Sequence, residues 1–134
     1  MKKTKTFSRN IQELENIFNF LKKNEKNLQL NKRQLHDIEL SVEEIFTNMI
    51  RHNTNSTQSI NISVESADRK FVACLTDHEA QPFDITQTTN IDIDNYLDEK
   101  RSGGFGIFLV KQLMDEVIFE HLRGISKVTI IKHI

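Results

Sequence analysis

Three of the four glycines in this 134-residue chain lie within four residues, at Gly103, Gly104 and Gly106. Glycine lets the backbone approach a ligand closely, and the free N–H groups at a helix start bind anions, phosphate above all. We therefore predict a phosphate site here, with a tight loop packed against a sheet as the alternative. A helical repeat of apolar residues follows directly: Ile107, Leu109, Val110, Leu113, Met114 and Val117.

Two well-known glycine motifs fit this cluster poorly. The Walker motif ends in Gly-Lys-Ser/Thr, whereas Gly106 is followed by Ile107. The dinucleotide fingerprint needs a strand directly before the glycines, but the residues at 98–101 are mostly charged. A phosphate ligand at this cluster must therefore be recognised by another arrangement.

Composition indicates a single domain over residues 1–134 and excludes several classes of protein. Lys plus Arg number 18 and Asp plus Glu number 19, so a bulk nucleic-acid binder or a polybasic membrane protein is not expected. No apolar stretch follows the basic segment Met1–Arg9, and none approaches the roughly 20 residues of a membrane span. Cys74 is the only cysteine. We expect a cytoplasmic protein without disulfides.

Apolar periodicity predicts an α+β two-layer sandwich, with a mixed, mostly antiparallel sheet and helices on one face. Short turns join most neighbouring strands, and the segment 78–102 reads as a long loop that could hold a short helix near 92–99. The expected elements are a strand at 2–7, a helix from Ser8 or Asn10 to about Asn27, a helix at 32–53 capped by Asn31, strands at 60–64 and 71–76, a helix after the glycines, and strands at 117–121 and 127–134.

The helix expected at 32–53 carries a candidate polar site. Glu44 and Asn48 are four residues apart, so their side chains point to the same side of the helix. Arg51 and His52 extend the same stripe. Such residues are also ordinary on a solvated helix face, so the pair alone is a weak signal.

A further carboxylate follows the apolar run at 71–76. Asp77 stands at the end of this expected strand, where it could bind the edge of a ligand. An aspartate that only starts a turn is an equally good explanation. The order of the three features carries more information than any one of them.

Glu-x-x-x-Asn on a helix, Asp after a strand and a Gly-Gly-x-Gly loop before a helix together resemble the GHKL (Bergerat-fold) ATP-binding superfamily. Within it, the chain is most similar to the anti-sigma-factor serine/threonine kinases of bacterial partner-switching systems. The segment 40–48 with His52 resembles their N-box, and the segment 103–117 resembles their last glycine box. Asp77 with Pro82-Phe83-Asp84 resembles the first glycine box. The resemblance covers nearly the whole chain.

The resemblance implies roles for the helix and strand residues. Glu44 would act as general base on a serine or threonine hydroxyl, or orient that hydroxyl. Asn48 would bind Mg²⁺ through its amide oxygen. Asp77 would accept a hydrogen bond from the adenine amino group. Ser126, or alternatively Thr129, would help to hold adenine from a late strand.

The resemblance also implies a phosphate-covering lid. The glycine cluster would form its hinge and floor, and Arg101 or Lys100 would place positive charge near the γ-phosphate. His52 would lie near phosphate, although a solvated histidine at a helix end is equally compatible with its position. ATP and Mg²⁺ are the cofactors that this arrangement implies.

The resemblance implies a kinase that phosphorylates an anti-sigma-antagonist (STAS-domain) protein and sequesters a sigma factor. It also implies that the protein could form a homodimer. No nucleic acid or membrane partner is expected. One feature departs from the family: Asp77-His78-Glu79 replaces the usual Asp-x-Gly and puts charge and bulk near adenine. This departure favours an alternative, a catalytically weak or inactive module that only sequesters a protein. The catalytic half of a histidine kinase is a weaker third interpretation.

Overall fold

The computed structural model describes residues 2–53, 56–78 and 104–134. The predicted helix near 92–99 lies outside these ranges. The elements in chain order are β1 (Lys3–Phe7), the 3-10 helix η1 (Ile11–Glu13), α1 (Leu14–Lys23), α2 (Lys32–His52), β2 (Ile60–Ala67), β3 (Lys70–His78), α4 (Gly104–Leu113), β4 (Glu116–Leu122) and β5 (Ile125–His133).

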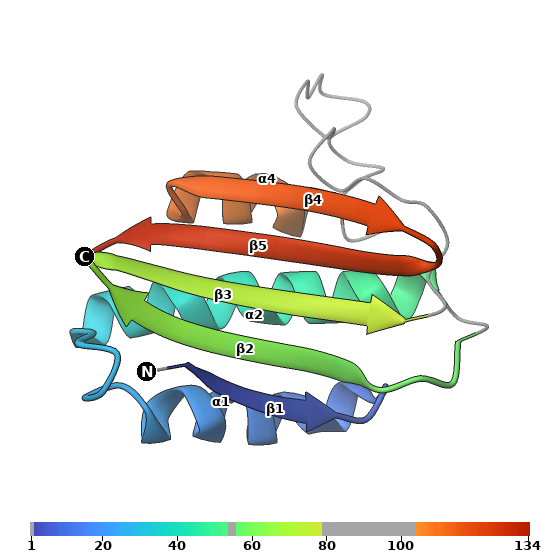
Figure 1. Ribbon diagram of the computed structural model, residues 1–134, viewed down its shortest axis with the longest axis horizontal. Coiled ribbons are helices and arrows are strands. Elements are labelled where there is room, and N and C mark those ends of the chain that lie inside the picture. The colour runs from blue at the N-terminus through green and yellow to red at the C-terminus, as the bar shows by residue number, and fades with distance from the viewer. Residues whose placement is uncertain (1, 54–55, 79–103) are drawn as a thin grey trace.

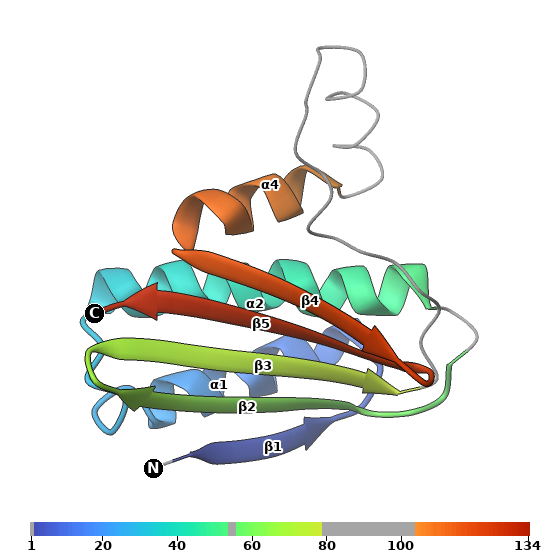
Figure 2. The same cartoon turned by 45° about the horizontal axis from the view of Figure 1, so that its top comes forward.

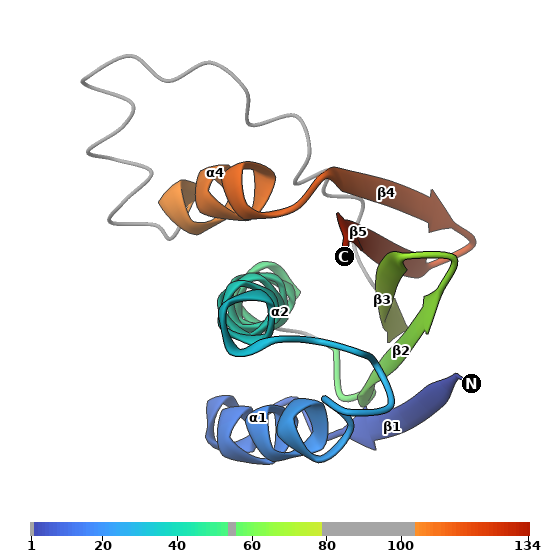
Figure 3. The ribbon, with the colours of Figure 1, turned by 90° about the vertical axis from the view of Figure 1, so that its left-hand side faces the viewer.

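The described part of the chain forms two layers, a five-stranded sheet and the helices α1, α2 and α4 on one of its faces (Figure 3). This confirms the predicted α+β two-layer sandwich. The strand order is β1-β2-β3-β5-β4. Every pairing in it is antiparallel, so the sheet of the described residues is not mixed. The reason is that hairpins join β2 to β3 and β4 to β5, while α1 and α2 run out and back between β1 and β2 (Figure 1).

Local signals set most element boundaries. Asn31 caps α2 by accepting a hydrogen bond from the backbone of Gln34, whose side chain accepts one in return from the backbone of Asn31. The hairpin between β2 and β3 turns through Asp68 and Arg69, which have φ angles of 52° and 62°. Two successive positive φ angles suit the right-handed twist of the flanking strands. The predicted cap and the predicted short turn between these two strands are both confirmed.

The first helical segment is shorter than the periodicity predicts. Asn10 caps the 3-10 turn η1, and the α-helix that follows ends at Lys23 instead of near residue 27. Asn24 donates a hydrogen bond from its side chain to the Phe20 carbonyl at 2.7 Å. Leu28 is fully buried beyond it. The apolar period thus continues to Leu28 although the helix has already ended at Lys23.

The helices lie against one face of the sheet (Figure 2), and buried side chains of the helices and the strands form one core cluster. Ile60, Ile62 and Val64 of β2 alternate inward, as side chains of a strand with one buried face do. On β3 the inward positions continue beyond Leu75 to Asp77. A carboxylate thus stands where the pattern would otherwise place an apolar residue. Within the described residues, no helix is both apolar enough and long enough for a membrane crossing.

Candidate active site

Asn48 lies on the C-terminal half of α2 and is only 2% exposed. Arg51 donates a hydrogen bond to its Oδ1 atom, but its Nδ2 atom has no hydrogen-bond partner within the described part of the chain. A buried donor without a partner costs about 1–3 kcal/mol. Such a group in a folded protein needs an explanation beyond stability, and a functional role is the first candidate.

Glu44 lies one turn before Asn48 and packs against the first turn of α4. A Cβ atom added at Gly106 would lie 1.8 Å from Oε2 of Glu44, so only glycine permits this approach. Burial raises the pKa of Glu44, the charge of Glu43 raises it further, and Arg51 lowers it. The structure therefore brings the predicted base and one of the predicted lid glycines into direct contact.

We expect Gly106→Ala to displace the Glu44 carboxylate. The overlap involves the far end of a movable side chain, so the free energy of unfolding should fall by less than about 1 kcal/mol, whereas any activity that needs Glu44 in place should fall strongly. Thermal unfolding and a phosphoryl-transfer assay measure the two effects. In a Glu44→Ala background, the added methyl group should have no further effect on transfer. An equal further loss in that background would show that the glycine acts independently of Glu44.

Asp77 is 2% exposed and lies at the C-terminal end of β3. Arg9 donates a hydrogen bond to Oδ1, and Asn53 donates one to Oδ2 at 3.3 Å. Burial raises the pKa of this carboxyl, while Arg9 and the hydrogen bond from Asn53 oppose that rise. The carboxylate is thus held in place by two side chains that the sequence analysis did not single out.

Ser126 and Thr129 both belong to β5, but their side chains point to opposite faces of the sheet. Ser126 is the register partner of Asp77, and its hydroxyl is hydrogen-bonded to His121 Nδ1 at 2.8 Å. Thr129 points to the opposite face, where its hydroxyl lies 3.4 Å from the sulfur of Cys74. Of the two candidates, the structure brings Ser126 to Asp77 and leaves Thr129 apart. His121 joins this row across the sheet, and no spacing in the sequence predicted it.

The two groups of predicted residues meet at one end of the sheet, where α2 and β3 both end (Figure 1). Arg9 connects them: besides binding Asp77, it donates to the carbonyl of Met49 at 3.0 Å, next to Asn48. His52 is exposed at the last residue of α2. Gly104 begins α4. The predicted residues Arg101, Lys100, Gly103, Glu79 and 82–84 lie outside the described residues.

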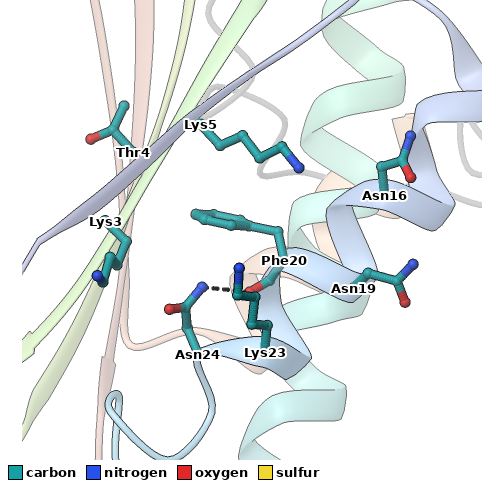
Figure 4. Close-up of a pocket in the computed structure, with 8 residues that line it drawn as sticks. All are labelled: Lys3, Thr4, Lys5, Asn16, Asn19, Phe20, Lys23 and Asn24. Atoms are coloured by element: carbon teal, nitrogen blue, oxygen red, sulfur yellow. Dashed lines mark hydrogen bonds between the residues drawn. The ribbon is translucent and has the colours of Figure 1, made fainter.

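Two cavities differ in their relation to this site. One of about 510 Å³ is lined by Gln58, His78 and the β4–β5 turn at 123–125, at the same end of the sheet as Asp77. The other, of about 300 Å³, lies between β1 and α1, where Lys5 and Lys23 extend around Phe20 (Figure 4). The second cavity contains none of the predicted site residues.

The donor set of the described residues fits a nucleotide-bound Mg²⁺. Within residues 2–53, 56–78 and 104–134, no group of three or more His, Cys, Asp and Glu side chains is arranged to hold a metal ion by itself. Magnesium that is bound to nucleotide phosphates needs only one or two protein oxygens, because phosphate oxygens and waters complete its octahedron. The buried Oδ1 of Asn48 is such an oxygen. To bind the metal, it would give up the hydrogen bond that it accepts from Arg51.

The family model for the histidine kinase-like ATPase domain matches residues 7–132. The chain belongs to this family. Serine-protein kinase RsbW of Staphylococcus aureus, from strains JH9 and Newman, is 31% identical over 99 residues, which span 69% of this chain and 62% of the relative. The chain therefore matches less than two thirds of the length of these relatives.

This histidine kinase-like ATPase domain is also similar in fold to a chain of a solved structure. The crystal structure of the SiaB–SiaC complex from Pseudomonas aeruginosa contains a chain similar to it, with a TM-score of 0.66 and 15% sequence identity. The match covers 96% of this chain and 88% of that one. The family resemblance and the fold that the motifs predicted are both confirmed. The roles of individual site residues remain predictions.

Proposed function

We propose that this protein is a Mg-ATP-dependent serine/threonine kinase and an anti-sigma factor of a partner-switching system. Its substrate is a serine or threonine hydroxyl of a STAS-domain antagonist, and its second partner is a sigma factor. The similarity to the serine-protein kinase RsbW of Staphylococcus aureus supports the kinase activity. A cytoplasmic location and a homodimer belong to the same proposal.

The observation that carries the proposal is the pairing of Glu44 and Asn48 on one side of α2, next to the start of α4. Asn48 would bind the metal, which neutralises phosphate charge in the transition state. Glu44, whose pKa is raised by burial, would accept the proton of the substrate hydroxyl or orient it. The backbone at the start of α4 would face the phosphates, as a helix N-terminus does for anions.

At the proposed purine end of the site, Asp77 is the residue that would recognise adenine. Its position on the helix-facing side of β3, beside Ser126 of β5, provides a buried acceptor for the adenine amino group. A buried acceptor of this kind discriminates well, because a wrong base would leave it without a partner. Metal and purine would therefore bind to residues of different elements that Arg9 holds together.

A second candidate function is a module that sequesters a protein partner with little or no catalysis. One observation favours it: the two oxygens proposed to bind the metal and adenine already have internal partners, since Arg51 binds Oδ1 of Asn48 and Arg9 binds Oδ1 of Asp77. A nucleotide would have to replace or share these contacts. The departure at Glu79 points in the same direction.

Phosphoryl transfer tests the proposal. The protein is incubated with γ-labelled ATP, Mg²⁺ and each STAS-domain protein of its organism, purified separately. We expect label on a serine or threonine of one of them, and none when EDTA replaces Mg²⁺. A protein that binds a STAS partner stably but never labels it would support the sequestering module and contradict the kinase.

A further inference from the structure

Arg9 forms three hydrogen bonds at the site, although it lies outside every motif. Its guanidinium donates to Asp77 Oδ1, to the Met49 carbonyl at 3.0 Å and to the Gln58 carbonyl at 3.2 Å. Its side chain is only 8% exposed. Only Ser8 separates it from β1, so it links the end of the first strand to the end of α2 and to the segment before β2. The three nitrogens of the planar guanidinium thus each donate to a different residue.

The hydrogen bond and charge that Arg9 supplies strongly influence whether the buried Asp77 carboxyl is ionised. A carboxyl group that is buried among apolar neighbours favours its neutral form. Arg9 supplies the positive charge that opposes this effect most strongly, followed by the Asn53 hydrogen bond and by the charge of His78. From β5, Ser126 faces Asp77 and is hydrogen-bonded to His121. Among the described groups around this carboxylate, Arg9 therefore supplies the positive charge that favours ionisation most strongly.

We propose that Arg9 is a positioning residue that keeps Asp77 ionised and oriented, and that it thereby sets the preference of the pocket for a purine with an amino group. This inference rests on the proposed nucleotide-binding function. It adds to that function a residue that selects the base without contacting it.

The chemistry of the two carboxyl forms explains the selection. An ionised carboxylate accepts hydrogen bonds at about four lone-pair sites, so Arg9 and Asn53 leave capacity for the amino group of adenine. A protonated carboxyl donates a hydrogen bond. It would therefore suit the carbonyl that inosine triphosphate presents in place of the amino group. Losing Arg9 should shift the pocket from the first form toward the second.

The test compares Arg9→Gln, which keeps size and a donor but not the charge, with the charge-retaining control Arg9→Lys. Dissociation constants for ATP and inosine triphosphate are measured by calorimetry from about pH 6 to about pH 9. We expect the unaltered protein and Arg9→Lys to prefer ATP across this range. For Arg9→Gln we expect ATP affinity to fall about tenfold at pH 6 and to recover as the pH rises. The preference for ATP over inosine triphosphate should fall by a similar factor.

The sign follows from the lost charge: burial raises the pKa of Asp77 even beside Arg9, and without the opposing charge of Arg9 the pKa would rise further, so ionisation would need a higher pH. Arg9→Gln that binds ATP independently of pH, with the original preference, would overturn the inference while leaving nucleotide binding intact. An unaltered protein that binds neither nucleotide would instead overturn the proposed function.

A measurement on the unaltered protein does not depend on how the variants fold. Carbon-13 NMR of the Asp77 carboxyl, assigned with Asp77→Asn, should show an ionised group at neutral pH. A protonated Asp77 in the presence of Arg9 would contradict the inference directly.

Discussion

Asn48→Leu is expected to make the nucleotide-free protein more stable while abolishing Mg-dependent binding of ATP. Leucine has a similar volume and removes the buried Nδ2 donor that has no partner among the described residues. The free energy of unfolding should therefore rise by about 1 kcal/mol. Urea denaturation measures this gain. Calorimetry with ATP, with and without Mg²⁺, should show that the metal no longer increases affinity, because the oxygen proposed to bind it is gone.

Asn24→Leu is the matched control for this substitution. Asn24 is also buried, but its amide donates to the Phe20 carbonyl at 2.7 Å. Its replacement should lower the free energy of unfolding by about 1–3 kcal/mol and leave ATP binding unchanged. If Asn48→Leu destabilised the protein as much as Asn24→Leu and still bound Mg-ATP, Asn48 would be an ordinary structural residue.

Glu44→Gln is expected to lower the rate of phosphoryl transfer by about 10²- to 10⁴-fold, the usual contribution of a general base. Glutamine keeps the size of the side chain that packs against Gly106, but it cannot accept a proton. Affinity for Mg-ATP should change little. Single-turnover transfer and calorimetry separate the two effects. Unchanged transfer would remove Glu44 from the mechanism.

The pH dependence supplies a second test of Glu44. Because burial and Glu43 raise the pKa of Glu44, transfer should slow as the pH falls through that pKa, where the base becomes protonated. Glu43→Gln is the control: it removes a like charge, so this acidic limb should move to lower pH with little change in the maximal rate. Glu44→Gln should show no acidic limb.

Much of the fold could be predicted because each element carries its own local signal. The Asn31 cap and the alternation at 60–64 belong to single elements and are confirmed. The end of α1 could not be predicted, because the apolar period continues to Leu28 although the helix ends at Lys23. The all-antiparallel pairing of the described strands depends on how the helices return the chain, which periodicity does not encode.

The same distinction applies to the site. Glu44 and Asn48 were predicted because helical geometry fixes their shared side. Arg9 was missed because its partner Asp77 lies 68 positions away and belongs to another element. No periodic pattern predicts a contact of that kind. Sequence motifs thus predict residues that would contact a ligand, whereas residues that hold those side chains in place are found only in the three-dimensional structure.

The central claim is that residues of α2, β3 and α4 bind one Mg-ATP molecule. Calorimetric titration of the unaltered protein with ATP, with Mg²⁺ and then with EDTA, tests it most directly. We predict saturable binding at one site per chain that weakens at least tenfold without the metal. No saturable binding, or the same affinity with and without Mg²⁺, would contradict it.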